Sequence, residues 1–368
     1  MASRKINPEL SALYESGTPV YSISRLDTIN HCMYEAYKTY IAKERGADSI
    51  YSLLGTRVHD TLEAIINGKA TADDLLPAML SELEDAEMVY SLSFPKGKDG
   101  DDIIRKNWVA DMTHFCTNYK KPSGKFKTED FFLYKSPKGR YLQGYIDLQK
   151  IDDSGSIDVF DYKTSTIYSK GEIKEHGRQL VVYGMALKQR GYDVKSVNWI
   201  FLKYANITFL GKKTSKSKNK TEITKTIERR KIASEMAKYV ESDLLESGYD
   251  ELDTEMILDD FKKSGDFSLL PPEIAGNYTV SDCVMNYPLN EETEAECNAY
   301  IDDTIDMWEA MSGAEDDYPP LQFVTTTKTG KEKQDTFYCV WLCDHFKTCK
   351  YIKEFFDSRK EEEEGDII

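Results

Sequence analysis

The stretch Tyr141–Lys163, YLQGYIDLQKIDDSGSIDVFDYK, decides the fold because two alternating runs flank a cluster of turn-forming residues. Asp, Ser and Gly fill positions 152–156, and these residue types favour tight turns. The stretch therefore predicts a β-hairpin. If the hairpin folds symmetrically about Ser154, Asp147 lies directly opposite Asp161, with side chains roughly 5 Å apart.

The alternation also assigns side chains to faces, because successive residues of a strand point to opposite sides. In the first strand, one face carries Leu142, Ile146 and Leu148, and the other carries Gln143, Tyr145 and Asp147. In the second strand, one face carries Ile157, Val159, Asp161 and Lys163.

Two facing carboxylates repel, so a fold that keeps them needs a cation between them. Mg²⁺ or Mn²⁺ fits best, since hard ions take carboxylate oxygens and leave positions for water and phosphate. Lys163 projects into the same space, where an ammonium orients water or offsets charge in a transition state. The alternative is an ordinary exposed hairpin whose acids and lysine form a solvated face.

The segments Gly144–Asp147 and Asp161–Lys163 resemble the signature of the PD-(D/E)XK nuclease superfamily. They are most similar to its RecB-like branch, which includes AddB and the CRISPR-associated RecB-like exonucleases. In that branch a helix bearing Gln-x-x-x-Tyr follows, and Gln179 and Tyr183 stand at that place, on one helical face. The resemblance implies an α/β fold with a restriction-endonuclease-like core, a mixed sheet flanked by helices. It implies catalytic roles for Asp147, Asp161, Lys163, Gln179 and Tyr183.

A helix expected around residues 55–66 carries the sequence Gly55-x-x-x-His59 beside an apolar stripe. A lone histidine on a helix is more often structural than a ligand. RecB-like nucleases, however, carry Gly-x-x-x-His here and use the histidine to bind metal. The resemblance thus implies four metal ligands, namely His59, Asp147, Asp161 and the backbone carbonyl of Tyr162. The family often has an acid on the preceding strand, so Glu129 is a second-rank candidate, with a surface glutamate as the alternative.

Seven cysteines in a chain expected in the cytosol do not indicate a disulfide framework. Three of them are scattered and expected to be structural, namely Cys116, Cys283 and Cys297. The other four lie near the two ends of the chain, at Cys32, Cys339, Cys343 and Cys349.

RecB-like nucleases with an iron–sulfur cluster place one cysteine on an early helix and three after the core. The resemblance therefore implies a [4Fe-4S] cluster that staples the two ends around the core. The usual distal spacing is Cys-x2-Cys-x5-Cys, whereas this chain has three residues in the first interval. Two alternatives are zinc with His345 as a substitute ligand, and free thiols in a buried terminal helix.

Composition describes a globular protein of 368 residues, 40% hydrophobic and 30% charged, with a net charge of −16. The charge argues against wrapping nucleic acid over the whole surface, so DNA contact requires a local basic groove. Such a groove is expected from the lysine-rich segment Gly211–Lys231, with a solvated loop as the alternative. No apolar run approaches a membrane span and Met1–Leu10 lacks a signal-peptide core, so we expect no membrane partner and a cytoplasmic location.

The pattern along the chain predicts five regions, with a helical N-terminal part and a helical insertion as additions to the core. They are residues 1–125, helical, with the first cysteine and the histidine; 126–205, the nuclease core; 206–330, the basic loop and helical insertion; 331–355, the cysteine segment; and 356–368, a disordered acidic tail.

These observations favour a metal-dependent deoxyribonuclease, most simply an exonuclease acting on DNA ends or single strands in recombination, repair or DNA processing. No Gly-x4-Gly-Lys-Ser/Thr loop is present, so a motor for processive action would be a separate helicase or recombination protein. The alternatives are a noncatalytic nucleic-acid-binding or assembly subunit with a nuclease-like fold, and a structure-specific or nicking endonuclease.

Overall fold

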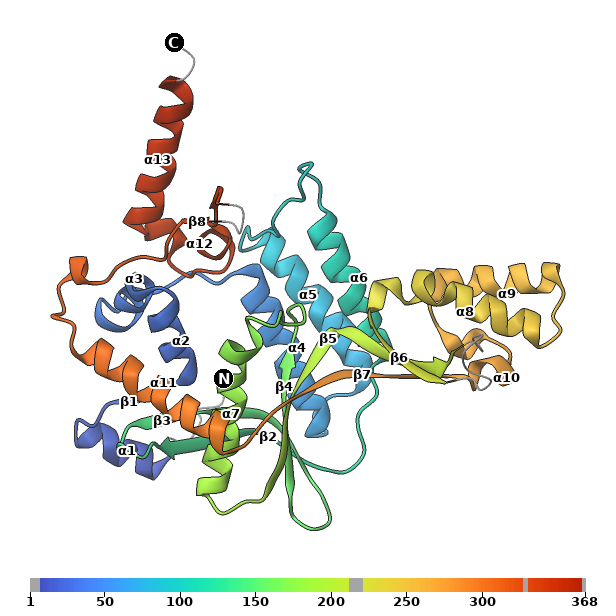
Figure 1. Ribbon diagram of the computed structural model, residues 1–368, viewed down its shortest axis with the longest axis horizontal. Coiled ribbons are helices and arrows are strands. Elements are labelled where there is room, and N and C mark those ends of the chain that lie inside the picture. Colours follow the sequence, from blue (N-terminus) through green and yellow to red (C-terminus); the bar gives the residue numbers. More distant parts are fainter. Residues whose placement is uncertain (1–6, 212–220, 327–329, 366–368) are drawn as a thin grey trace.

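The computed structural model describes the backbone of residues 7–211, 221–326 and 330–365, and side chains as far as Arg359. Within these residues a seven-stranded mixed sheet is flanked by helices (Figure 1). The strands of this sheet are β1 (Val20–Tyr21), β2 (Lys125–Lys135), β3 (Tyr141–Ile151), β4 (Ile157–Lys163), β5 (Val194–Leu210), β6 (Glu222–Glu228) and β7 (Tyr278–Tyr287). The mixed sheet between helices agrees with the expected fold class.

The helices fall into four groups. The N-terminal group is α1 (Pro8–Glu15), α2 (Ile23–His31), α3 (Met33–Ala36), α4 (Ile50–Ile66), α5 (Leu75–Met88) and α6 (Ile103–Asn118). The core helix is α7 (Ile173–Gln189). The distal group is α8 (Ile232–Glu246), α9 (Glu251–Ser264) and α10 (Pro272–Ala275). The C-terminal group is α11 (Glu291–Glu309), α12 (Phe337–Trp341) and α13 (Lys350–Gly365).

The predicted hairpin is confirmed with its register. Antiparallel β3 and β4 pair Leu148 with Phe160 and Ile151 with Ile157, which centres the turn on Ser154. The Asp152 carboxylate accepts hydrogen bonds from the backbone of two turn residues, at 2.8 and 3.0 Å. Turn chemistry and alternation therefore select one register.

Strands β3 and β4 separate beside Asp147, and we call this point the fork. Strand β2 pairs along β3 from Tyr141 to Ile151 and so occupies one edge of β3. The other edge is shared, because β1 pairs with Tyr141 and Leu142 while β4 pairs only from Leu148 onward. On its other edge β4 pairs in parallel with β5 along its whole length. Asp147 therefore lies where β4 separates from β3.

The expected common face for Ile146 and Leu148 is wrong. Ile146 packs in the core beside α7, and Leu148 packs in the core beside α4 to α6. The reason lies on β2, where Glu129 stands between residues paired with Leu148 and Ile146 and has φ of +47°. A left-handed residue interrupts regular pleating, so alternation changes at this point.

Two cores cover the two faces of the sheet. Helices α2, α7 and α11 pack on one face around Trp199 and Val159, and α4, α5 and α6 pack on the other around Ile200 and Leu202. In Figure 1 α7 and α11 lie together across the sheet from α5 and α6. Each helix buries one apolar stripe, as on α4, where the buried positions include Leu54, Val58 and Leu62.

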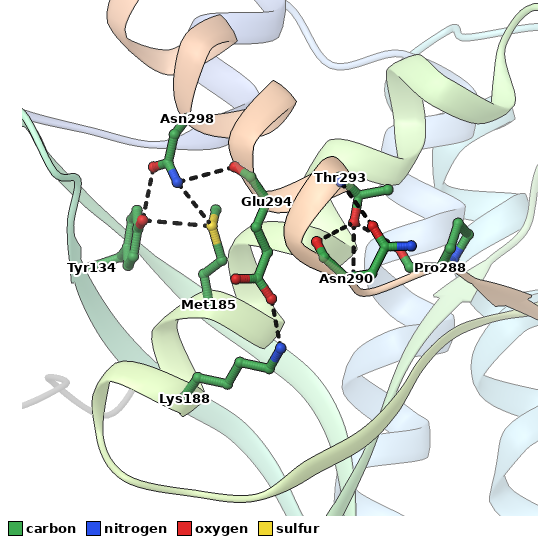
Figure 2. Close-up of polar contacts among 8 residues, drawn as sticks. All are labelled: Tyr134, Met185, Lys188, Pro288, Asn290, Thr293, Glu294 and Asn298. Atoms are coloured by element: carbon green, nitrogen blue, oxygen red, sulfur yellow. Dashed lines mark hydrogen bonds and ion pairs between the residues drawn. The ribbon is translucent and has the colours of Figure 1, made fainter.

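Helix α11 is also tied to α7 and β2 by polar contacts (Figure 2). The Tyr134 hydroxyl donates to Asn298 Oδ1 at 2.8 Å, and Lys188 Nζ donates to Glu294. Asn290 and Thr293 cap the start of α11 reciprocally. These bonds orient α11 over the core helix.

The region 206–330 contains helices, as expected for a helical insertion, but it also contains strands that the sequence did not indicate. It supplies β6 and β7, which pair with the long strand β5 and extend the sheet into an arm (Figure 1). Helices α8 to α10 pack on this arm around a third core that includes Phe209 and Phe261. Alternation in β6 and β7 is obscured because most of their residues are exposed.

Over residues 356–365 the C-terminal part differs from the disordered tail that we expected, because α13 continues to Gly365; the rest of that tail, 366–368, lies outside the described residues. Its start is anchored by buried Ile352 and by Phe355, whose ring lies 5.2 Å from that of Phe323. The Lys, Arg and Glu residues that follow are good helix formers. A short hairpin, β8 (Val324–Thr326) and β9 (Glu332–Gln334), precedes α12.

Candidate active site

Asp147 lies on β3 at the fork, and its carboxylate reaches the backbone of β4. Its Oδ2 accepts a hydrogen bond from the backbone N–H of Tyr162 at 3.2 Å, where the main-chain ladder has ended. Burial, and then the charge of Asp161, raise the pKa of Asp147 to about 8. The carboxyl is thus held where its charge is poorly compensated, which is typical of functional acids.

Asp161 and Lys163 form the second part of the site. Asp161 is 1% exposed, and its Oδ2 lies 2.6 Å from Lys163 Nζ without receiving a hydrogen bond of regular geometry. Burial lowers the pKa of Lys163, but the adjacent Asp161 outweighs it and holds that pKa above its usual value. The ammonium therefore stays charged beside the acids.

Gln179 and Tyr183 on α7 extend the network from Lys163. Lys163 Nζ donates to Gln179 Oε1 at 3.0 Å, and Gln179 Nε2 donates to the Tyr183 hydroxyl at 2.8 Å. Burial raises the pKa of Tyr183 well above its ordinary value, so the phenol stays neutral. The i, i+4 spacing thus places both side chains in one chain of bonds that orients the lysine.

His59 reaches the same place from α4. Its Nδ1 lies 3.5 Å from Asp147 Oδ2, and the ring meets that of Tyr162 edge-on at 5.9 Å. Burial lowers the pKa of His59, so the imidazole is neutral at pH 7 and keeps a lone pair for a ligand. The site therefore gathers a histidine, two carboxylates and a lysine from α4, β3 and β4.

This arrangement agrees with a comparison of the sequence with known families. Residues 20–266, more than half of the chain, match the model of the PD-(D/E)XK nuclease superfamily. The chain belongs to this superfamily. No curated protein matches the chain.

PD-(D/E)XK nucleases typically use Mg²⁺ or a similar divalent ion, and the donors of this site suit such an ion. Buried Asp161 Oδ2 lacks a regular hydrogen bond, and Asp147 has a raised pKa, so each carboxylate has room for a cation. His59 adds a neutral nitrogen. Among the described residues no three His, Cys, Asp or Glu side chains stand as an already formed metal site.

Glu129 lies across β3 from the fork and its charge adds to the raised pKa of Asp147. It borders a depression together with Glu63, Phe131 and Tyr145. The left-handed backbone at Glu129 is the local distortion that accompanies the change of face at Asp147.

The four cysteines of the two chain ends come together in this PD-(D/E)XK protein. All line one cavity, with Cys32 and Cys339 buried and the other two, Cys343 and Cys349, half-buried. Burial, and then neighbouring Cys32, raise the pKa of the Cys339 thiol to about 12. Four sulfurs around one cavity fit a cluster or zinc, although the thiols do not form a completed metal site among the described residues.

His345, the alternative zinc ligand, lines the same cavity and is 3% exposed. Its Nε2 is 2.8 Å from the Thr39 hydroxyl, and its backbone N–H points to Cys343 Sγ at 3.4 Å. A metal-bound histidine usually has such a bond at its other ring nitrogen, so His345 stays an alternative ligand to one of the cysteines.

The lysine-rich segment Gly211–Lys231 is described only in part, because residues 212–220 lie outside the described residues. The described arginines have structural bonds. Arg229 Nε donates to the Leu202 carbonyl at 2.8 Å, and Arg230 pairs with Asp111. No helix in the described part of the chain is long and apolar enough to cross a membrane.

Sequence patterns did not indicate a further acid whose pKa Lys163 influences, Asp27 on α2. Asp27 accepts a hydrogen bond from the Tyr300 hydroxyl at 2.8 Å and lies 3.9 Å from Arg178, which stacks on the Tyr300 ring. Burial raises the pKa of Asp27 to about 6. Its partners come from α7 and α11, so spacing along the chain carries no signal for this cluster.

Proposed function

We propose that the chain is a metal-dependent deoxyribonuclease of the RecB-like type that acts as an exonuclease on DNA ends or single strands. The observation that carries this proposal is the convergence of Asp147, Asp161 and Lys163 at the fork of β3 and β4, with Lys163 Nζ 2.6 Å from Asp161. Two acids and a charged lysine at one strand junction suit hydrolysis of a phosphodiester.

The side chains at the fork have different roles because they differ in charge and in hydrogen-bond partners. Lys163 is charged and held by Gln179, so its ammonium is placed to orient the attacking water and to offset charge on the phosphate. Tyr183 positions Gln179 and so acts one step farther from the substrate. Acids at the fork repel a phosphate unless they are neutralised, which makes cleavage conditional on a cation.

His59, Asp147, Asp161 and the carbonyl of Tyr162 would hold Mg²⁺ or Mn²⁺. A bound ion of this kind supplies an acidified water and positive charge beside the phosphate oxygens.

The four cysteines would hold a [4Fe-4S] cluster, with zinc as the alternative ion. This proposal is supported by the cavity that Cys32 shares with Cys339, Cys343 and Cys349, because that cavity brings together residues from the two ends of the chain. This centre would contribute to folding, because it lies with α3 and α12 rather than at the fork.

The test is Lys163→Ala, with Lys195→Ala as a matched control for an exposed lysine that pairs with Asp152 in the turn. We expect Lys163→Ala to lose cleavage of linear DNA in Mn²⁺ by about 100-fold or more, with DNA affinity retained. The control should cleave like the wild type. A fully active Lys163→Ala protein would contradict the role of the lysine, and DNA bound but uncut by every variant would favour an assembly subunit.

A further inference from the structure

Two adjoining cavities lie on the face of the sheet that α4 to α6 cover, away from α7. One has a volume of about 360 Å³ and lies between α6 and the distal arm. The other, of about 200 Å³, lies over β3, β4 and β5. They share a wall, because the same four residues line both, namely Phe115, Tyr119, Lys120 and Asp282.

The larger cavity is built around a buried cation. Arg229 is 5% exposed, and it donates from Nε to the Leu202 carbonyl at 2.8 Å and from Nη2 to Asp282 Oδ1 at 3.0 Å. The Leu202 carbonyl is available because the pairing of β5 with β7 shifts register between Ile200 and Ala205. Five N–H donors are present on a guanidinium, so these two bonds leave donors for a ligand.

Further polar groups face this cavity. His114 Nδ1 is buried and has no hydrogen-bond partner within the described residues. Burial lowers the pKa of His114 to about 4, so the ring is neutral and can donate or accept according to its tautomer. Asn118, Ser268 and Ser281 complete the polar wall.

The smaller cavity is mostly apolar. Its lining includes the rings of Phe126, Phe160 and Tyr162 and the side chain of Val284, which is 44% exposed. Lys150 stands at the same cavity. Aromatic rings of this kind suit a planar ring by stacking.

The charges favour an anion at the junction. Asp282 is paired with Arg229, and Asp266 caps the turn at Ser268. Neither Lys120 nor Lys150 forms an ion pair with any residue in the described ranges. The lining of the two cavities therefore carries three cations, Lys120, Lys150 and Arg229, against the two carboxylates of Asp266 and Asp282, so cations are in excess.

We propose that the joined cavities bind a nucleoside monophosphate or an anion of the same shape, with its planar base in the apolar cavity and its phosphate beside Arg229 and Lys120. The combined size is that of a small-molecule site, apolar for most of one wall with a few converging polar groups. The site does not use the acids of the fork, and it stands whether or not the chain cleaves DNA.

Tyr162 connects this site to the fork. Its side chain lines the apolar cavity, while its backbone N–H donates to Asp147 on the other side of the strand. A ligand that fixes the ring therefore also fixes the amide that holds Asp147. The match to the family ends at residue 266, whereas Ser268, Ser281 and Val284 come from the chain beyond it.

The experiment is calorimetric titration of the full chain in chelator with dAMP, deoxyadenosine and inorganic phosphate. We expect dAMP to bind at least tenfold more tightly than either fragment. Lys120→Glu and Val284→Trp should each weaken dAMP binding at least tenfold, since one reverses a charge and the other fills the apolar cavity. The controls are Lys121→Glu, next in sequence but outside the cavities, and Asp161→Asn at the fork, and both should bind dAMP like the wild type.

Several results would overturn the proposal. These are no binding of dAMP by the wild type, binding that survives in both cavity variants, and binding that is lost in Asp161→Asn, which would place the nucleotide at the fork. Melting curves of Lys120→Glu and Val284→Trp, which change exposed residues, separate loss of the site from loss of the fold.

Discussion

The fork at Asp147 and the pocket of four cysteines are both polar centres assembled from distant residues, but they are held in different ways. At the fork, pairing of β3 with β4 sets the positions before any ligand is considered, and the Tyr162 amide fixes Asp147. At the pocket, Cys32 follows α2 and the other cysteines lie around α12, with few regular hydrogen bonds between the two segments.

The fold holds the residues of the fork in place, whereas the cysteine pocket, with a bound cluster, would help to hold the fold together. Backbone hydrogen bonds and two hydrophobic cores fix the fork, so its side chains can be changed without unfolding the sheet. The cysteine pocket joins the ends of the chain through side chains, so a bound cluster would add stability there. Changes at the fork should therefore affect activity, and changes at the pocket should affect stability.

The largest effect is expected from Asp147→Asn. DNA cleavage should fall by about 1,000-fold or more, while stability in chelator at pH 8 to 9 should be equal or higher. The sign follows from the pKa, which is raised from 3.8 to about 8 in the folded protein. The folded state then disfavours the charged acid, and this penalty grows as pH rises from about 4 through 8.

Cleavage rates and melting temperatures at pH 6 and pH 9 provide the check. The asparagine variant should gain stability over the wild type at both pH values, and the gain should be larger at pH 9. A variant that unfolds at both pH values would show that Asp147 supports the fold. That result would contradict the expectation that changes at the fork affect activity rather than stability.

The next effect is expected from Cys339→Ser, on stability rather than on the chemistry of cleavage. A tightly held cluster contributes on the order of 3–4 kcal/mol, so melting should drop by roughly 5–10 °C. Cys297→Ala is the matched control, because Cys297 is buried in the core beside Arg178 and should cost only about 1 kcal/mol.

Iron and zinc analysis with absorbance near 400 nm would accompany these melts. A brown wild type whose colour is lost in Cys339→Ser would favour an iron–sulfur cluster. Colourless protein with stoichiometric zinc would show that the cysteines bind zinc instead. Equal stability of the two variants with no bound metal would contradict the cluster altogether.

Local patterns were sufficient where the deciding contacts are close in sequence. The turn at 152–156 and the alternation on either side predict the register about Ser154, and the i, i+4 spacing predicts that Gln179 and Tyr183 share a face. The left-handed Glu129 and the change of face at Asp147 could not be predicted, because they depend on how β2 lies against β3. Strand β7 and the cavity at Arg229 arise from pairing across some 80 residues, for which spacing carries no signal.

A smaller effect is expected from Gln179→Ala. Loss of the bond to Lys163 Nζ removes about 1–1.5 kcal/mol, or roughly tenfold in the rate. The reduction should appear in kcat rather than KM, because Gln179 acts by orienting Lys163. Tyr183→Phe should have a weaker effect in the same direction. A change confined to KM would instead indicate that Gln179 contacts the substrate.

The smallest effect is expected at the contact between α7 and α11. Lys188→Ala removes a surface ion pair with Glu294 and should change stability by less than about 0.5 kcal/mol. Tyr134→Phe should cost about 1 kcal/mol, since the lost bond to Asn298 is partly buried (Figure 2). Urea denaturation measures both. A larger loss for Lys188→Ala would mean that charge, rather than burial, fixes α11.

The most direct test of the fork as a metal-dependent nuclease centre compares wild type with Asp161→Ala on circular and end-labelled linear DNA. Each protein is purified anaerobically and assayed with Mn²⁺, Mg²⁺ or chelator. We expect the wild type to degrade linear DNA but not circular DNA, and to do so only with a divalent ion. Asp161→Ala should degrade neither. Cleavage by Asp161→Ala at the wild-type rate, or cleavage that continues in chelator, would contradict this expectation.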